Sequence, residues 1–208
     1  MPRRYNSKET VEMILTAAIK RFNEKGYEKT SMQEIVDESG VSKGSIFHHF
    51  NSKEEILAAV IINQAKAHEQ TVRKWLNEMN ASTAREKMIA YFDSILDYTH
   101  TDALDALNEQ ILKSPQIVLT LMQENLKIAA PLFAKIFREG IEDGSITVDF
   151  PEECAEALIL LINYWCNSTL FECNPETLIN RIKLLQQMMK QMGADIISDN
   201  HVSKIAKL

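Results

Sequence analysis

The chain has little of what would build a disulfide-stabilised or membrane-embedded protein. Its 208 residues include 3 cysteines, an odd number and too few for a disulfide framework. Free thiols are typical of a reducing cytoplasm. The longest apolar run, residues 157–162, is far shorter than the roughly 20 residues that span a bilayer. The charges near the N-terminus have no apolar segment behind them, so we expect no signal peptide and no membrane contact.

Motifs that would indicate catalysis or cofactor binding are also missing. The sequence contains no glycine-rich phosphate loop, no Gly-x-Ser-x-Gly motif, no cluster with metal-ligand spacing and no clear carboxylate pair. His48 and His49 are adjacent, so on a helix their side chains point about 100° apart and cannot easily share a metal ion. We therefore expect no enzyme activity, no cofactor and no metal site.

The charge is unevenly distributed along the chain. The net charge of −6 at first argues against nucleic acid as a partner. Residues 1–53, however, hold nine Lys/Arg against seven Asp/Glu, and the remainder holds 14 against 22. Binding depends on local patches rather than on the total charge, so a small basic face near the N-terminus is compatible with DNA.

What the sequence does contain is a series of helix signals. Glycine (6 residues) and proline (5) are few, and almost nothing alternates with period two, which favours an all-α fold. Capping boxes predict helix starts at Asn6–Glu9, Ser31–Glu34, Ser52–Glu55 and Thr83–Glu86. Further helices are expected from Ser42 to about His49, near residues 104–111, over 116–139 with a break at Pro131, near 152–173 and near 176–192. The helix that starts at Ser52 is expected to extend to about Leu76.

Residues 31–50 have the spacing of a helix-turn-helix. Ser42, Lys43 and Ser45 lie in the first turn of its second helix, the end that normally faces base edges. Gly44 costs up to about 1 kcal/mol relative to alanine in a helix, which is tolerable if a bare backbone must approach another surface. Lys53 opposes the dipole at the start of the next helix, which indicates a nearby anion. For His48, a solvated surface position and a DNA contact both remain open.

Residues 7–57 resemble the DNA-binding domain of the TetR family of bacterial transcriptional regulators. The segment GVSKGSIFHHFNSKEEIL, residues 40–57, carries the resemblance. It follows the family pattern Gly-Val-Ser-x-Gly-(Ser/Thr)-hydrophobe-aromatic-x-His/Tyr-Phe-x-x-Lys-Glu. One residue departs from it: Phe47 stands where the family usually has tyrosine, so a phosphate-binding hydroxyl is missing. The Phe47 ring can still pack on a sugar or a thymine methyl group.

The resemblance implies the division of the chain and the DNA contacts. A three-helix DNA-binding module over residues 1–52 would be joined by a long helix to a ligand-binding and dimerisation bundle over 53–192, followed by a loose tail over 193–208. Thr30 and Ser31 would touch phosphate, Lys43, Gly44 and Ser45 would approach bases, and Phe47, His48 and Lys53 would grip the backbone. With the cap residue Ser42, these form the expected DNA-binding site.

A dimer is expected from the last two long helices. Residues 153–171 are apolar nearly all round, so a second chain is the simplest cover for the side that one chain leaves open. In the next helix, apolar residues step by four and three, as in a coiled-coil seam, and Leu184 and Met188 form a second apolar line. The resemblance places a four-helix dimer interface here. The expected interface residues are Leu158, Leu161, Leu178, Ile182, Leu185 and Met189.

Aromatic residues and methionines between these regions are either ordinary core or the lining of an apolar pocket. The expected pocket residues are His68, Trp75, Phe92, Met122, Phe133 and Trp165. The resemblance implies a cytoplasmic, ligand-responsive repressor that binds a palindromic double-stranded DNA operator as a homodimer and is released by an apolar or aromatic effector. The alternatives are a corepressor-dependent regulator and a helical interaction or DNA-binding protein that does not regulate transcription.

Overall fold

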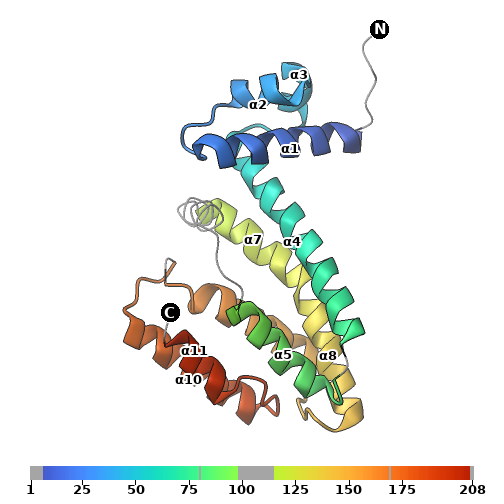
Figure 1. Cartoon of the computed structure of the whole chain (residues 1–208), viewed down its shortest axis with the longest axis vertical. Coiled ribbons are helices and arrows are strands. Elements are labelled where there is room, and N and C mark those ends of the chain that lie inside the picture. The colour runs from blue at the N-terminus through green and yellow to red at the C-terminus, as the bar shows by residue number, and fades with distance from the viewer. Residues whose placement is uncertain (1–6, 80, 98–114, 169, 207–208) are drawn as a thin grey trace. The chain divides into compact units, whose positions relative to one another are not determined.

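A computed structural model of the chain describes residues 7–79, 81–97, 115–168 and 170–206 (Figure 1). Every regular element in these ranges is a helix. The elements are α1 (Ser7–Lys25), α2 (Met32–Ser39), α3 (Lys43–His49), α4 (Lys53–Glu78), α5 (Ala84–Asp97), α7 (Pro115–Ile128), α8 (Ala130–Asp143), α9 (Pro151–Leu160), the π-helix η1 (Leu161–Trp165), α10 (Pro175–Gln191) and α11 (Asp199–Ile205). The helix expected near residues 104–111 and the cap at Asn6 lie outside the described residues.

Helix starts were well predicted by the capping signals. Ser31 forms a complete capping box with Glu34, in which each side chain accepts a hydrogen bond from the other residue's backbone N–H. Ser42, Ser52 and Thr83 cap α3, α4 and α5 by accepting a hydrogen bond from the amide three residues on. The break near Pro131 is also confirmed, because α7 ends at Ile128 and α8 begins with this proline in its first turn.

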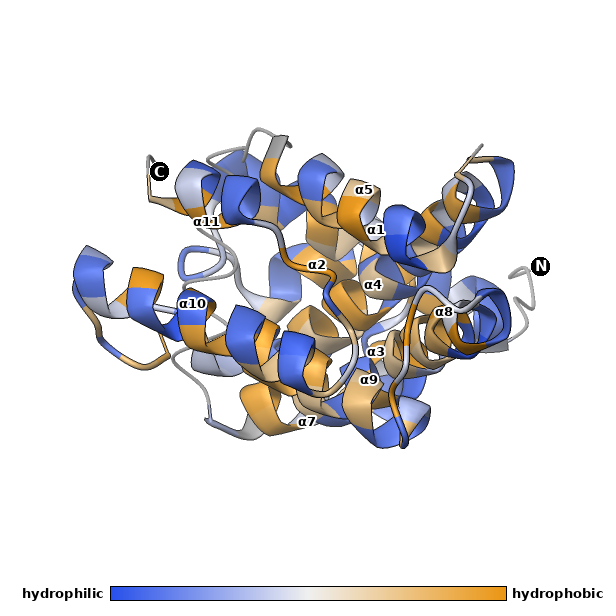
Figure 2. Cartoon of the chain, turned by 90° about the horizontal axis from the view of Figure 1, so that it is seen from below, coloured by the Kyte–Doolittle hydropathy of each residue, from blue (hydrophilic) through white to orange (hydrophobic). Residues whose placement is uncertain are grey.

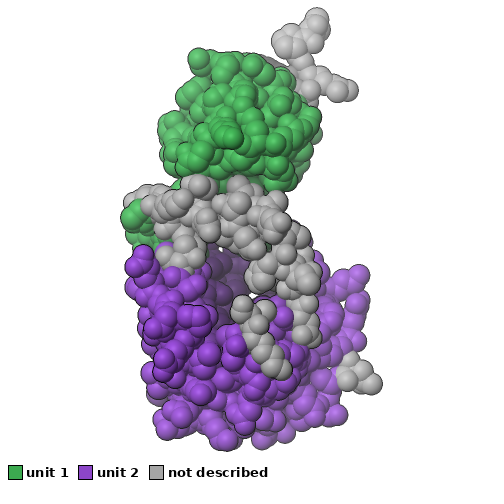
Figure 3. Space-filling model, turned by 60° about the vertical axis from the view of Figure 1, so that its left-hand side comes forward, with its two compact units in different colours: residues 1–65, 100–121 green, residues 66–99, 122–208 purple. Residues whose placement is uncertain are grey.

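The chain forms two compact units (Figure 3). The first comprises residues 1–65 and 100–121, and the second comprises residues 66–99 and 122–208. Both α4 and α7 contribute residues to each unit. The functional boundary expected after residue 52 stays a prediction, whereas the division by contacts falls inside α4.

The first unit is built around the long helix α1 and the two short helices α2 and α3, which pack on one another. Its core is completed by the first turns of α4 and by two residues of α7. The main buried side chains are Ile14, Leu15, Ala18, Phe22, Ile35, Val41, Ile46, Phe50, Ile56, Leu57, Val60 and Ile117. Gly40 ends α2 with φ 66°, a left-handed conformation in which glycine is favoured. This turn directs the chain into α3.

In the second unit, α8 packs on α9 and α5, α11 packs on α5, and α10 packs on η1 and α11. Hydrophobic and hydrophilic residues alternate along α10, as expected for a helix with one buried side (Figure 2). Side chains at the centre of the core include Met88, Phe137, Leu158, Leu185, Met189 and Ile196.

The helix expected over residues 152–173 is shorter than predicted. It widens into the π-helix η1 and ends at Trp165. Arg181 of α10 donates hydrogen bonds from Nη1 to the carbonyl oxygens of Trp165 and Phe171, at 2.9 and 3.2 Å. These bonds satisfy carbonyl groups at and beyond the helix end, so the chain can leave the helix there.

The expectation of a loose tail over residues 193–208 is wrong for the described part of that segment. Gly193 turns the chain with φ 93°, Ile196 and Ile197 are buried, and α11 docks on α5. Lys204 of α11 donates to Asp93 of α5 at 2.9 Å. The segment is polar in composition, but Ala194, Ile196, Ile197 and Val202 are buried in the core, which holds the segment in place.

The segment Ile117–Asp143 has the length and mean hydropathy, 1.2, of a candidate membrane span. It is divided at Ala129 into two helices, and α8 exposes Lys135 and Arg138 while it buries Phe133 and Phe137 in the core. The segment is therefore not one continuous helix, and α8 is a core helix of the second unit.

Candidate nucleic-acid interface

The outer face of α3 is formed by residues that the helix turns away from the core. Ile46 is buried, and so is Phe50 just beyond the helix, whereas the side chains on the opposite side are exposed. The exposed residues of this face are Lys43, Gly44, Phe47 and His48. Phe47 is 43% exposed, and the Lys43 Nζ lies 5.9 Å from its ring centroid. An aromatic ring left in solvent beside a cation is suited to contact with another molecule.

Gly44 has no internal reason to be a glycine. A Cβ atom added to it would meet no atom within 4 Å, and its φ is not in the left-handed region. Inside a helix, glycine nevertheless costs about 1 kcal/mol relative to alanine. An external surface that must approach the backbone closely is therefore the remaining physical reason for this residue.

The neighbouring polar residues differ in their availability. Ser42 is exposed, and its Oγ accepts the hydrogen bond from the half-buried Ser45 amide at 3.2 Å. The rings of His48 and His49 meet edge to face, 5.3 Å apart. Within the described residues, no group of three or more His, Cys, Asp or Glu is placed to hold a metal ion. His48 is thus an exposed side chain of the α3 face.

The Thr30 side chain has partners within its own chain, and its expected phosphate contact stays a prediction. Thr30 is only 2% exposed, and its hydroxyl donates to the carbonyl oxygens of Gly26, at 2.9 Å, and Arg21, at 3.3 Å. It therefore closes the C-terminal end of α1. Ser31 is exposed, but its hydroxyl and amide are both engaged with Glu34 in the capping box.

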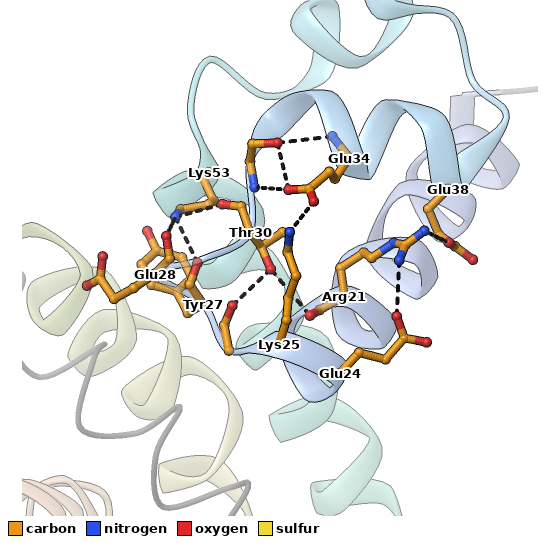
Figure 4. Close-up of polar contacts among 11 residues, drawn as sticks. Arg21, Glu24, Lys25, Tyr27, Glu28, Thr30, Glu34, Glu38 and Lys53 are labelled. Carbon is orange, nitrogen blue, oxygen red and sulfur yellow. Dashed lines mark hydrogen bonds and ion pairs between the residues drawn. The ribbon is translucent and has the colours of Figure 1, made fainter.

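Lys53 also differs from the expectation of a phosphate contact. Its ammonium points to the connection between α1 and α2 and donates to the carbonyl oxygens of Tyr27, Glu28 and Thr30 (Figure 4). An ammonium group has three N–H donors, and each has an acceptor here. This cluster was not recognisable in the sequence, because its acceptors are backbone atoms that no residue pattern reveals.

The cations around α2 are paired within the unit. Lys25 binds Glu34, and this contact, with the hydrogen bonds from Ser31, lowers the pKa of the Glu34 carboxyl to about 2. Lys20 and Arg21 bind Glu38 at 2.6 and 2.5 Å, which lowers the pKa of that carboxyl as well. These cations are partly neutralised, so attraction for phosphate depends more on cations such as Lys43.

The residues expected at the dimer interface are mostly buried within their own chain, so the expected interface needs correction. Leu158, Ile182, Leu185 and Met189 are all buried in the core of their own chain, so they cannot form the centre of an interface with a partner. Leu161 and Leu178 lie at the margin of that core. The second apolar line of α10 is the one that faces outward: Leu184 is exposed and Met188 is half-buried. Met192, the residue that caps the helix, is exposed as well.

This outward line ends at an apolar hollow of about 510 Å³ at the start of α9. Its lining residues are Val148, Asp149, Phe150, Glu153, Cys154, Ala157 and Met192. A second, polar hollow of about 330 Å³ lies at the start of α5, beside Glu139 and Asp143.

Neither hollow is lined by any of the six expected pocket residues. Phe92 and Phe133 are core residues whose rings pack against His201 and Tyr91, respectively. Trp165 is half-buried, 5.7 Å from the Arg181 guanidinium; Trp75 is exposed and Met122 is half-buried. The side chain of His68 lies outside the described residues. A pocket formed by this group stays a prediction.

Two sequence models match the chain. Residues 14–60 match the model for bacterial regulatory proteins of the tetR family, and residues 103–188 match a tetracyclin repressor-like C-terminal domain. Together these matches span well over half of the chain. The chain belongs to the TetR family. The matched N-terminal residues include the whole helix-turn-helix, so this TetR-family protein is a transcriptional regulator.

Individual relatives agree with this assignment. The TetR-family chain is 25% identical over 185 residues to the HTH-type transcriptional regulator UidR of Escherichia coli, covering 86% of this chain and 89% of UidR. It is 34% identical over 99 residues to an uncharacterised HTH-type transcriptional regulator of Lactococcus lactis, a match that spans 47% of each chain.

Solved structures agree in fold. The complex of RolR with resorcinol has a TM-score of 0.64 at 14% identity, covering 96% of this chain and 94% of RolR. A TetR-family regulator from Pectobacterium atrosepticum has a TM-score of 0.62 at 17% identity, and the match covers 92% of this chain and 97% of the other.

Proposed function

We propose that this TetR-family regulator is a repressor that binds a palindromic operator as a homodimer and leaves it when a small apolar or aromatic effector binds. The observation that carries the proposal is the outer face of α3. Lys43 and Phe47 are presented to solvent there, and Gly44 is a glycine that the chain itself does not need.

On this proposal, α3 lies in the major groove. Lys43 donates to the acceptor edge of a guanine or to a phosphate, and the bare backbone at Gly44 allows a close approach by Ser45. The Phe47 ring packs on a sugar or a thymine methyl group, while Ser42 and His48 contact the sugar–phosphate backbone. Residues 1–52 would supply the DNA-binding function, with Lys53 and Thr30 acting indirectly.

The outward line of α10 supports a revised dimer interface. Leu184, Met188 and Met192 follow one another at steps of four residues, and a row of this kind is suited to packing against the same row of a second copy. A twofold dimer presents two α3 helices, so operator half-sites should repeat about 34 Å apart or at a multiple of that distance.

Two solved relatives guide the choice of effector. RolR was solved with resorcinol, and FadR of Bacillus subtilis with stearoyl-CoA. We infer that the effector of this chain binds residues of the second unit, among which Trp75, Met122 and Trp165 remain candidates. Both tryptophans of the chain are in this unit, so intrinsic fluorescence reports on binding there.

The proposal includes a cytoplasmic location and the absence of enzyme activity. Free cysteines support the first, since Cys154, Cys166 and Cys173 form no disulfide. Burial raises the pKa of Cys154 and of Cys166 to about 11, which leaves both thiols poor nucleophiles. The family assignment supports the second, because the family consists of transcriptional regulators.

The test begins with selection of bound sequences from random duplex DNA by the purified chain. We expect a palindrome with two half-sites at helical spacing. Recovery of only random sequence would overturn the proposal. Resorcinol and stearoyl-CoA are then titrated with and without the selected operator while tryptophan fluorescence is followed.

A coupling of about 1–3 kcal/mol, typical of allostery, would weaken operator binding about 5- to 150-fold, and operator would weaken the probe by the same factor. Tighter operator binding with the probe would show a corepressor instead. A probe that binds equally well with and without operator would show that it is not coupled to DNA.

A further inference from the structure

Lys53 is the first residue of α4, and its side chain runs back to the connection between α1 and α2 (Figure 4). The Nζ atom donates to the carbonyl oxygens of Tyr27 at 2.8 Å, Thr30 at 2.9 Å and Glu28 at 3.4 Å. It also lies 4.1 Å from the centroid of the Tyr27 ring, in a cation–π contact. Carbonyl dipoles and an aromatic face thus surround the charge, and the group is partly removed from solvent.

The next residue of α4 holds the same connection from another side. Glu54 accepts a hydrogen bond from the Tyr27 hydroxyl at 2.9 Å. Burial, reinforced by this bond, raises the pKa of the Tyr27 phenol well above its usual value, so the phenol stays a donor. The Tyr27 ring is itself packed edge to face on Phe22 of α1, with centroids 5.3 Å apart. The start of α4 is therefore fastened to the end of α1 through Tyr27.

These contacts close a ring of chain around the helix-turn-helix. Lys53 and Thr30 are 23 residues apart in sequence, and α2, its turn and α3 lie between them. The ammonium thus holds together the point where the chain enters α2 and the point where it has just left α3. Fixing both ends of a binding element in advance reduces the ordering that binding would otherwise cost.

We propose that Lys53 is a positioning residue for DNA binding, which sets the orientation of α3 through the α1–α2 connection and does not itself touch phosphate. The proposal rests on the proposed function, in which α3 is the DNA-contacting helix. If Lys53 is a positioning residue, replacing it by arginine should weaken DNA binding. Three carbonyl groups that converge on one point suit a compact ammonium, whereas the planar fork of arginine does not fit them. At a phosphate, arginine would serve as well as lysine or better.

The experiment compares Lys53→Met, Lys53→Arg and Lys43→Met in the full-length protein. Binding to the selected operator is measured over a series of salt concentrations, at a temperature where circular dichroism shows each variant to be folded. We expect both Lys53 variants to bind about tenfold more weakly than the wild type, because the loss of charge-assisted hydrogen bonds loosens the element that carries α3. The slope of log K against log salt should stay unchanged in Lys53→Met and fall by about one in Lys43→Met.

Two results would overturn the proposal. A slope that falls by about one in Lys53→Met, with wild-type affinity in Lys53→Arg, would place the ammonium on a phosphate. Wild-type affinity in both folded Lys53 variants would mean that the contacts of Lys53 with the α1–α2 connection contribute to stability alone. If Lys53→Met does not fold, the affinity of Lys53→Arg decides alone: a loss of about tenfold supports the positioning role, and wild-type affinity overturns it. A wild-type protein without sequence-specific binding would overturn the proposed function itself, before any variant is compared.

Discussion

Leu184 and Leu185 are neighbours on α10 and lie in opposite environments. Leu185 is 0% exposed at the centre of the second unit's core, whereas Leu184 is 46% exposed. The two side chains have the same composition and size, so their environments alone determine what a substitution does at each position.

Leu184→Glu should give a folded protein that does not dimerise. The new carboxylate is in water in the monomer and would be buried without a partner in the proposed interface, which is strongly unfavourable. Sedimentation or light scattering should show a monomer, and operator affinity should fall because two half-sites no longer act together. A folded Leu184→Glu dimer would place the interface elsewhere.

Leu185→Glu is the matched control for that variant. Here the carboxylate enters the core of its own chain, so the expected result is unfolding or a loss of several kcal/mol of stability, whatever the oligomeric state. Thermal unfolding by circular dichroism separates the two outcomes. A stable, monomeric Leu185→Glu variant would restore the first interpretation of the seam.

Gly44→Ala should make the protein more stable and a weaker DNA binder. Alanine gains up to about 1 kcal/mol in a helix interior, and its methyl group meets no atom of the chain. The methyl group should hold DNA away from α3, and we expect roughly a tenfold loss of operator affinity. Urea denaturation and fluorescence anisotropy measure the two effects on the same sample.

Gly140→Ala provides the contrast to Gly44→Ala. A Cβ atom at Gly140 would lie 2.7 Å from the Ile146 side chain, so this change should lower stability. Unchanged operator binding by a stabilised Gly44→Ala variant would show that DNA does not approach the backbone closely at Gly44.

Phe47 should read thymine methyl groups in the operator. Replacing a contacted thymine by deoxyuridine removes one methyl group, and the loss of that apolar contact corresponds to about fourfold in affinity. The effect should disappear in Phe47→Ala and persist in Phe47→Tyr. If no thymine position in the half-site is sensitive to the exchange in the wild type, the ring contacts sugar instead.

The Glu34 carboxylate should contribute to stability only above acidic pH. Lys25 and Ser31 hold the pKa of Glu34 at about 2 in the folded protein, below its ordinary value of 4.5. A lowered folded pKa means that the contribution is present above pH 4.5 and is lost as the pH falls towards 2. The difference in unfolding free energy between wild type and Glu34→Gln should therefore shrink over this range.

Urea denaturation at successive pH values measures this difference. Glu28→Gln removes an exposed carboxylate of the adjacent loop and controls for the change in net charge. A wild-type advantage over Glu34→Gln that is the same at pH 3 and pH 6 would contradict the prediction.

Local signals in the sequence predicted local structure well. The capping box of Ser31 and Glu34, the caps at Ser42 and Thr83 and the break at Pro131 each depend on residues within four positions of one another. Such hydrogen bonds and steric clashes are decided by the segment itself. The exposed face of α3 followed from the same local pattern.

Choices that depend on distant parts of the chain were not predictable. α10 carries two apolar lines, and periodicity alone cannot decide whether Leu185 or Leu184 faces its own core. Thr30 and Lys53 have polar side chains that suggested DNA, but their partners are carbonyl oxygens brought near by folding. The fold of residues 193–206 depends on α5, a helix about a hundred residues earlier in the chain.

The hydrogen bonds from Lys53 to the α1–α2 connection do not depend on most of the side chains there, because their acceptors are backbone carbonyl oxygens. Every polypeptide of the same length offers these acceptors. Substitutions at Glu28 and Lys29 would leave all three acceptors in place, whereas insertion or deletion of a single residue between Tyr27 and Ser31 would displace them. The side chains at positions 28 and 29 are therefore free to change, whereas the length of the stretch is not. Grafts of a foreign recognition helix into this scaffold should accordingly retain the native spacing from residue 27 to residue 53.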